Sequence, residues 1–125
     1  MKKRILLVED EPNIVVSLTF LLERAGFEVA TESNGQNAID TILDDPPDTL
    51  VLDVMLPGLD GFEILRRVRA DPRVEKLPVL MLTAKGQRED RKNALEIGAD
   101  MFITKPFSNT EVVEAVRELA ARGPQ

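Results

Sequence analysis

The sequence predicts a three-layer α/β domain built on a parallel sheet of five strands. Short apolar segments alternate with segments of helical periodicity, five times in succession and without internal repeats. Because βα units connect through right-handed crossovers, this alternation implies a parallel sheet covered by helices on both faces. For five such units the natural strand order is the flavodoxin-like 2-1-3-4-5, written (βα)5. A length of 125 residues suits one domain with a real core.

The first two units occupy the N-terminal third of the chain. Arg4–Val8 is a short apolar segment that indicates a buried strand, and Pro12 suits the first turn of the following helix. Apolar residues then recur at helical spacing until Gly26, which stands where a C′ glycine belongs. Phe27–Thr31 is predicted as the second strand. The apolar face of the second helix consists of Ala38, Ile39, Ile42 and Leu43.

The third unit carries the most informative stretch of the chain. Leu50–Asp53 is a strand that ends on a carboxylate, and its apolar residues indicate burial on both faces. Asp60, with Glu63 three residues later, predicts a capping box at the start of the third helix. Asp71-Pro72 ends that helix, and Pro78–Leu82 is predicted as the fourth strand.

The last two units follow the same order. Thr83-Ala84-Lys85-Gly86 leads into a mostly polar helix at about Arg88–Ile97. Met101–Thr104 is predicted as the fifth strand. Ser108 and Glu111 then predict a second capping box, which opens the last helix.

Composition excludes several function classes. The net charge of -6 argues against nucleic acid binding through a broad basic face. The chain has no cysteine and no histidine, which excludes thiolate or imidazole metal ligands and histidine-based catalysis. Any bound metal must have oxygen ligands, which favours Mg²⁺, Mn²⁺ or Ca²⁺.

The N-terminus begins like a signal peptide, with basic residues before apolar ones. Its apolar part, Ile5–Val8, is too short for that role. No segment approaches the ~20 apolar residues of a membrane span. We therefore expect a cytoplasmic location and no membrane partner.

Polar side chains follow several strands of the predicted sheet. Glu9 and Asp10 follow the first strand, and Asp53 ends the third. Thr83 and Lys105 follow the fourth and fifth strands. In the predicted strand order, the carboxyl ends of strands one and three flank the crevice in which open α/β sheets bind ligands. We therefore expect these side chains to share one site.

Three neighbouring carboxylates repel one another and favour a hard divalent cation. Asp10 and Asp53 are candidate direct ligands of Mg²⁺, with Mn²⁺ as the alternative ion. Glu9 is expected to act through water, and the backbone carbonyl of Met55 to complete the protein ligands.

The same residue types suit phosphoryl transfer. An ionised Asp53 needs no general base and can act as the nucleophile. Lys105 and the Thr83 hydroxyl suit phosphoryl oxygens. Taken singly, each residue has an ordinary structural explanation, such as an acidic pair that complements a helix dipole. Their conjunction on independent strand ends is what favours a phosphoryl site.

These residues resemble the receiver domain of two-component response regulators. The resemblance runs from about Lys3 to Arg122 and rests on L-L-V-E-D-E, L-V-L-D-V-M-L-P-G-L-D-G, L-T-A and F-I-T-K-P-F, in this order and spacing. It implies a receiver domain over residues 3–122 and a tail or linker start over 123–125. The chain is then either a free-standing receiver or a fragment cut near Arg122.

The resemblance also implies roles for individual residues. Asp53 would accept a phosphoryl group from a histidine kinase or histidine phosphotransfer protein. Glu9, Asp10 and Met55 would hold Mg²⁺. The domain would catalyse only its own phosphorylation and dephosphorylation, and so would not be an enzyme in the ordinary sense.

Three further residues would form the switch of the family. Thr83 would be its hydroxyl, Phe102 its aromatic residue, and Lys105 the lysine of the family pattern, joined to Pro106 by a cis bond. The responding surface would consist of the fourth helix, the fifth strand and the fifth helix. It would serve an unidentified output protein or domain.

A phosphorylation-dependent homodimer is a further hypothesis for that surface. The DNA-binding branch of the family uses alternating charges there. Arg91, Glu96 and Asp100 fit that pattern loosely, whereas Met101 and Ala115 replace expected charges.

Other functions remain as alternatives. A haloacid-dehalogenase-like phosphohydrolase would need a second aspartate two residues after Asp53, where Met55 stands. A flavin carrier of this fold would be expected to stack tryptophan or tyrosine on its ring, and the chain has neither. The P-loop motif is absent. A degenerate receiver that acts as an interaction module is the third alternative.

Overall fold

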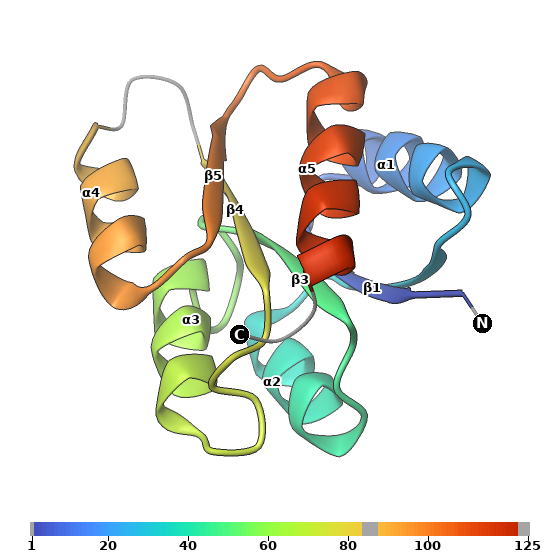
Figure 1. The fold of residues 1–125 in the computed structure, drawn as a ribbon. Coiled ribbons are helices and arrows are strands. Elements are labelled where there is room, and N and C mark those ends of the chain that lie inside the picture. The colour runs from blue at the N-terminus through green and yellow to red at the C-terminus, as the bar shows by residue number, and fades with distance from the viewer. Residues whose placement is uncertain (1, 84–87, 123–125) are drawn as a thin grey trace.

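The structure, a computed structural model, describes residues 2–83 and 88–122 (Figure 1). The predicted turn at Ala84–Gly86 and the predicted tail at 123–125 lie outside the described residues.

Strands and helices alternate along the whole described chain (Figure 1). In chain order they are β1 Arg4–Val8, α1 Pro12–Arg24, β2 Glu28–Glu32, α2 Gly35–Asp44, β3 Thr49–Asp53, α3 Gly61–Ala70, β4 Val79–Thr83, α4 Arg88–Ile97, β5 Met101–Thr104 and α5 Asn109–Arg122.

The strands form one parallel sheet in the order β2-β1-β3-β4-β5, which confirms the predicted fold class. Strands β2 and β4 are each shifted by one residue from the prediction, and β3 begins one residue earlier, at Thr49. Strand β2 begins at Glu28 because the buried Phe27 still belongs to the turn after α1, where its N–H donates to Leu22 O. Strand β4 extends to Thr83, which pairs with Thr104 of β5.

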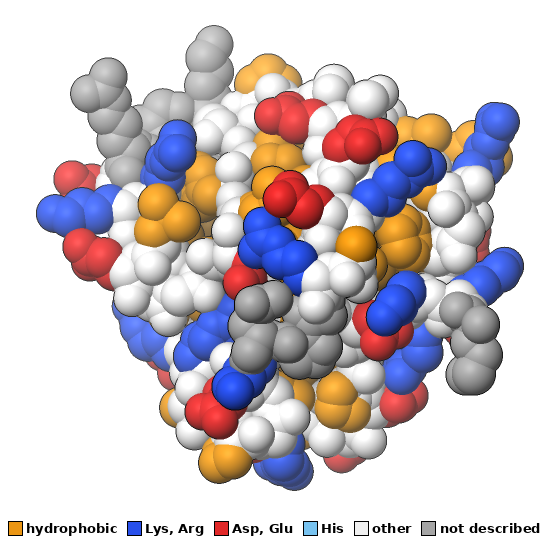
Figure 2. Space-filling view, in the orientation of Figure 1, with side chains coloured by type: hydrophobic (Ala, Val, Ile, Leu, Met, Phe, Trp, Pro, Cys, Tyr) orange, Lys and Arg blue, Asp and Glu red, His pale blue; other side chains and the backbone are white. Residues whose placement is uncertain are grey.

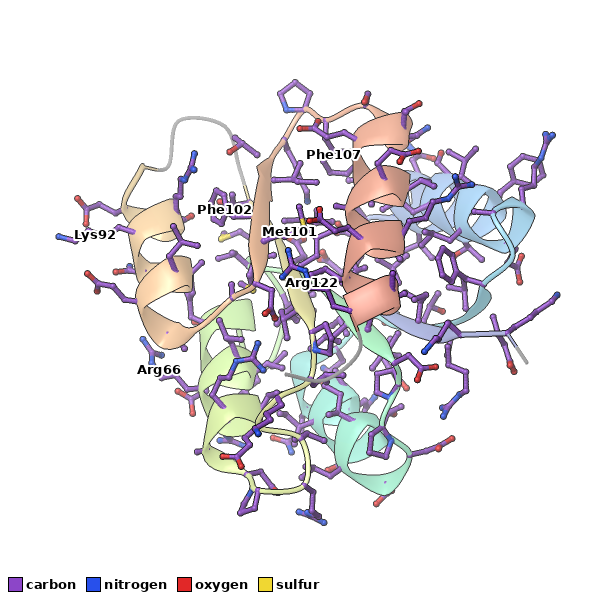
Figure 3. All side chains as sticks on the ribbon, in the orientation of Figure 1. Arg66, Lys92, Met101, Phe102, Phe107 and Arg122 are labelled. Atoms are coloured by element: carbon purple, nitrogen blue, oxygen red, sulfur yellow. The ribbon has the colours of Figure 1, made fainter. Side chains whose placement is uncertain are left out.

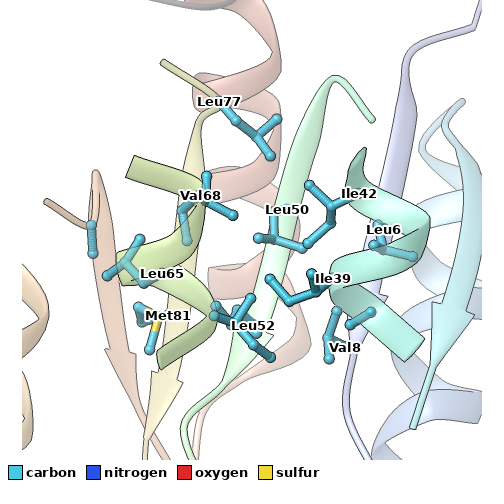
Figure 4. Close-up of a cluster of buried hydrophobic side chains, with 14 of the residues drawn as sticks. Leu6, Val8, Ile39, Ile42, Leu50, Leu52, Leu65, Val68, Leu77 and Met81 are labelled. Carbon is cyan, nitrogen blue, oxygen red and sulfur yellow. The ribbon is translucent and has the colours of Figure 1, made fainter. Parts of the chain in front are cut away.

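The sheet separates two apolar clusters, since alternate side chains of a strand point to opposite faces. Helices α2, α3 and α4 pack against one face, through strand residues that include Leu52 and Met81 (Figure 4). Helices α1 and α5 cover the other face, through residues that include Val51 and Leu82. We call these the α2–α4 face and the α1–α5 face.

Helix termini follow the predicted chemistry in part. Gly26 has a φ of 102°, the left-handed conformation expected of a C′ glycine. Asp60 and Ser108 accept hydrogen bonds from the N–H groups of Glu63 and Glu111, which is one half of each predicted capping box. The Glu63 side chain instead pairs with arginines of its own helix. These caps fix where α3 and α5 begin.

Within the described residues, every helix is too short or too polar to pass through a lipid bilayer.

Candidate functional site

Three carboxylates converge at the carboxyl end of the sheet, as predicted. Glu9 follows β1 and Asp53 ends β3, and both are buried, with 1% and 2% of their surface exposed. Asp10 is exposed at the rim. One oxygen from each of the three carboxylates lies within 4.8 Å of the others.

Lys105 joins two of these carboxylates. Its Nζ lies 3.2 Å from Glu9 Oε1 and 3.2 Å from Asp53 Oδ2. The Lys105 N–H donates to Thr83 O, which fixes the start of the segment after β5. The bond from Lys105 to Pro106 is cis, as the resemblance implied.

Burial and neighbouring charges shift two pKa values in this cluster. Burial raises the pKa of Glu9 to about 7, and the neighbouring Asp53 carboxylate adds to the rise. The Glu11 N–H and Lys105 only partly oppose it. Burial lowers the pKa of Lys105, but Asp53 and Glu9 outweigh burial and the pKa is raised.

The oxygens of the cluster fit a hard divalent cation. Glu9 Oε2 accepts hydrogen bonds from the Asp10 and Glu11 N–H groups, at 3.1 and 3.2 Å. Glu9 Oε1 is buried and has no hydrogen-bond partner among the described residues, although it lies beside Lys105. A buried carboxylate oxygen in this state retains lone pairs for a ligand.

Met55 lies beside the phosphoryl candidate Asp53. The Met55 N–H donates to Asp53 Oδ1 at 3.3 Å, which orients the carboxylate. Met55 itself is 69% exposed. The Met55 carbonyl remains a predicted metal ligand.

Thr83 does not join the cluster. Its buried hydroxyl donates to Asp90 Oδ2 at 3.0 Å. Thr83 has the strand parity of Met81, so its side chain lies on the α2–α4 face, where α4 begins. The sequence did not identify Asp90, because adjacent Glu89 and Asp90 are equivalent first-turn acids by pattern.

Phe102 shares that face of the sheet. It is half-buried and packs against the core of the α2–α4 face (Figure 3). The figure places it between β5 and α4, whereas Phe107 lies beside the first turn of α5. Thr83 and Phe102 therefore adjoin the same helix, α4.

At two glycines, the backbone near the site packs directly against another backbone segment, and the sequence analysis did not predict these contacts. A Cβ on Gly61 would meet Asp53 O and would lie 2.8 Å from Val54 Cα. A Cβ on Gly35 would meet Leu59 O. Spacing along the chain does not predict either close approach, since each one depends on how a turn or a distant segment folds back.

The surface formed by α4, β5 and α5 carries charged side chains around hydrophobic ones (Figure 2). Asp100, which the dimer hypothesis placed among its surface charges, is engaged internally. Its Oδ2 accepts from Arg69 Nη2 at 2.9 Å and from the Val79 N–H at 2.8 Å. Ala115 is buried beneath this surface. Neither residue offers a surface contact of the expected kind.

Comparison with known proteins identifies a family for this geometry. The family model for the response regulator receiver domain matches residues 5–117. The alkaline phosphatase synthesis transcriptional regulatory protein PhoP of Bacillus subtilis is 45% identical over 122 residues, which is 98% of this chain and 50% of that protein. The chain spans about half the length of the curated relatives it matches.

Solved structures agree with the fold. A chain from Chloroflexus aurantiacus J-10-fl superimposes with a TM-score of 0.93 at 37% identity, covering 98% of this chain and 100% of that one. The receiver domain of the sensor histidine kinase PA1611 from Pseudomonas aeruginosa PAO1 superimposes with a TM-score of 0.83 at 28% identity, covering 97% and 99%. That structure has a magnesium ion coordinated in its active site cleft.

Proposed function

This chain belongs to the response regulator receiver domain family, a family of signalling domains in two-component systems, and from that membership we propose that Asp53 is its phosphoacceptor. The observation that carries the proposal is the position of Lys105, whose Nζ lies 3.2 Å from both Asp53 Oδ2 and Glu9 Oε1. A cation at this point can neutralise charge on a phosphoryl group arriving at Asp53.

In the proposed reaction, an Asp53 carboxylate oxygen attacks the phosphorus of a phosphohistidine. A new P–O bond forms, and the P–N bond breaks with its electron pair remaining on the imidazole. The Met55 N–H, which donates to Asp53 Oδ1, holds the other carboxylate oxygen. The chain contributes mainly position and charge, as is usual in phosphoryl transfer.

The acidic cluster would hold the divalent ion on which this transfer depends. Asp10 and Asp53 would be direct ligands, Glu9 would act through water, and the Met55 carbonyl would complete the protein ligands. Bound Mg²⁺, or Mn²⁺ in its place, would neutralise and orient phosphoryl oxygens. The magnesium ion in the receiver domain of PA1611 supports this assignment.

Phosphorylation would then act as a switch. Added charge and acceptor oxygens at Asp53 would draw the Thr83 hydroxyl, and Phe102 would turn into the space that Thr83 leaves. The surface formed by α4, β5 and α5 would shift between two states that already exist in equilibrium.

The expected partners follow from the family. A histidine kinase or histidine phosphotransfer protein would supply the phosphoryl group, and an unidentified output protein or domain would read the switched surface. A phosphorylation-dependent homodimer remains a hypothesis for that surface. We propose that this domain makes no direct contact with nucleic acid or membrane. We also propose a cytoplasmic location.

We further propose that the receiver domain spans residues 3–122, with 123–125 as a tail or linker start. Beyond its own phosphorylation and dephosphorylation, we propose no catalytic activity for it.

Intact mass after incubation with acetyl phosphate tests the proposal. We expect a Mg²⁺-dependent gain of one phosphoryl group, ~80 Da and labile as an acyl phosphate should be. The gain should vanish in Asp53→Asn and persist in Asp40→Asn, which changes an exposed carboxylate of α2. An adduct that survives in Asp53→Asn would refute the assignment.

A further inference from the structure

We infer that Asp90 is a positioning residue of the switch: its carboxylate holds the Thr83 hydroxyl away from Asp53 and so favours the unphosphorylated state. This inference rests on the proposed function. It concerns the equilibrium between the resting and active states, and it assigns the preference for the resting state to one side chain of α4.

The first step is the direction of the Thr83 hydroxyl. Its oxygen lies 3.0 Å from Asp90 Oδ2, and Thr83 is fully buried. A hydroxyl has one proton to donate. While that proton is donated to Asp90, it cannot be donated to a phosphoryl oxygen on Asp53. Asp90 and the phosphoryl group therefore compete for the same donor.

The second step concerns what can move. The Thr83 backbone is held by strand pairing with β5 and by the Lys105 N–H that donates to Thr83 O. The competition must therefore be resolved by rotation of the Thr83 side chain between staggered rotamers. Rotation toward Asp53 breaks the bond to Asp90.

The third step concerns the helix on which Asp90 lies. Along α4, from Glu89 to Ile97, Ala94 is the one fully buried residue. Leu95 is 48% exposed, and Ile97 is only half-buried. A helix with so little buried apolar surface depends more on polar contacts for its position. The bond from Thr83 to Asp90 ties its first turn to the end of β4.

Together these steps link the phosphoryl site to the responding surface. When the Thr83 hydroxyl donates to the phosphoryl group instead of to Asp90, the hydrogen bond between β4 and α4 is lost. Conversely, removal of the Asp90 carboxylate destabilises only the resting arrangement, so less binding free energy is needed to reach the active one.

Asp90→Ala should therefore bind the phosphoryl mimic beryllofluoride about ten times more tightly than the wild type, which is about 1.4 kcal/mol. The initial rate of phosphorylation by acetyl phosphate should rise in the same direction. Asp90→Asn keeps an acceptor oxygen but loses the charge, and should lie between the two because charge-assisted hydrogen bonds are the stronger.

Glu89→Ala is the matched control. Glu89 is an exposed acid of the same first turn, so this variant removes the same charge from the same helix end. The two alanine variants share any general effect on anion binding, and their difference isolates the contact with Thr83. We expect Glu89→Ala to stay within about twofold of the wild type.

The experiment titrates these variants with beryllofluoride in saturating Mg²⁺ by calorimetry, because the chain has no tryptophan or tyrosine to report binding. A double-mutant cycle with Thr83→Val shows whether Asp90 acts through the hydroxyl. In the Thr83→Val background, Asp90→Ala should increase the affinity for beryllofluoride no more than Glu89→Ala does. Equal gains for Asp90→Ala and Glu89→Ala, or an undiminished gain beside Thr83→Val, would overturn the inference and leave the proposed function intact. If the wild type neither binds beryllofluoride nor gains a phosphoryl group, the proposed function itself fails.

Discussion

Lys105 Nζ lies 3.2 Å from Asp53 Oδ2, although the two residues are 52 positions apart in the chain. The same nitrogen is equally close to Glu9 Oε1, so one cation serves two buried carboxylates. Burial lowers the pKa of this lysine, but its two acidic neighbours stabilise the charged form more strongly, so the pKa is raised. The charged lysine therefore lies where it can neutralise charge on a group that arrives at Asp53.

Lys105→Met should slow phosphorylation by acetyl phosphate about 100-fold. The variant keeps the length of the side chain but removes the charge that faces the transferring group. Initial rates from intact mass would measure the loss. Lys92→Met, which changes an exposed lysine of α4, should retain the wild-type rate. Equal rates for the two variants would contradict the role of Lys105.

Asp10→Asn should weaken Mg²⁺ binding at least about tenfold, because it removes one carboxylate of the cluster. Since Asp10 is exposed, the metal-free variant should unfold at the wild-type temperature or above, through reduced repulsion. Calorimetric titration with Mg²⁺ gives the affinity. Asp40→Asn controls for net charge. Unchanged affinity in Asp10→Asn would exclude Asp10 as a ligand.

The metal-free protein should lose stability as the pH rises. The pKa of Glu9 is raised from 4.5 to about 7 in the folded state, so the folded state binds this proton more tightly than the unfolded state does. That contribution is complete below pH 4.5 and is lost as the pH passes through about 7. Thermal unfolding with chelator should therefore show a lower midpoint at pH 8 than at pH 5.5.

Glu9→Gln should remove most of this pH dependence, because glutamine does not titrate. In the wild type, adding Mg²⁺ at pH 8 should raise the unfolding midpoint again, since an ion that binds only the folded state stabilises it. Asp71, whose pKa is lowered to about 2, titrates outside this pH range. The same fall in the wild type and in Glu9→Gln would show that another group is responsible.

Gly61→Ala should impair both stability and phosphorylation. The added Cβ would meet Asp53 O and would lie 2.8 Å from Val54 Cα, so backbone at the end of β3 must shift. Overpacking of this kind costs about 1–3 kcal/mol. Gly26→Ala is the control: its Cβ meets open space, but its φ of 102° is unfavourable for alanine, at about 1–2 kcal/mol. Both variants should unfold earlier, and only Gly61→Ala should be phosphorylated more slowly.

Arg69→Ala should destabilise the fold by about 2 kcal/mol without abolishing phosphorylation. The Arg69 guanidinium donates to the carbonyls of Glu75, Leu77 and Gly98, in addition to its ion pair with Asp100. Its removal leaves the partly buried Leu77 and Gly98 carbonyls without this donor and Asp100 without its cation. Arg73→Ala, which breaks an exposed pair with Asp71, should leave the midpoint of thermal unfolding unchanged. Equal midpoints for the two variants would contradict the importance of these contacts.

Sequence patterns were sufficient for the architecture. Apolar segments, helical periodicity and capping signals predicted the ten elements that the described residues form, and the α/β alternation predicted the strand order, because these patterns express local burial and a fixed crossover handedness. The site carboxylates and Lys105 were also predictable, since the carboxyl ends of parallel strands meet at one edge of the sheet. Boundaries were less exact where Phe27 belongs to the core although its backbone belongs to a turn.

By itself, then, the sequence determined the fold, the edge of the sheet at which the site lies and the residue types that meet there. Only the tertiary structure decided which of them touch. It places Lys105 beside Glu9 and Asp53, but turns Thr83 toward Asp90, and it commits Asp100 to Arg69. The physical reason is that strand periodicity fixes the face on which a side chain lies, whereas hydrogen bonds and pKa shifts depend on distances and burial set by chain segments far apart in sequence.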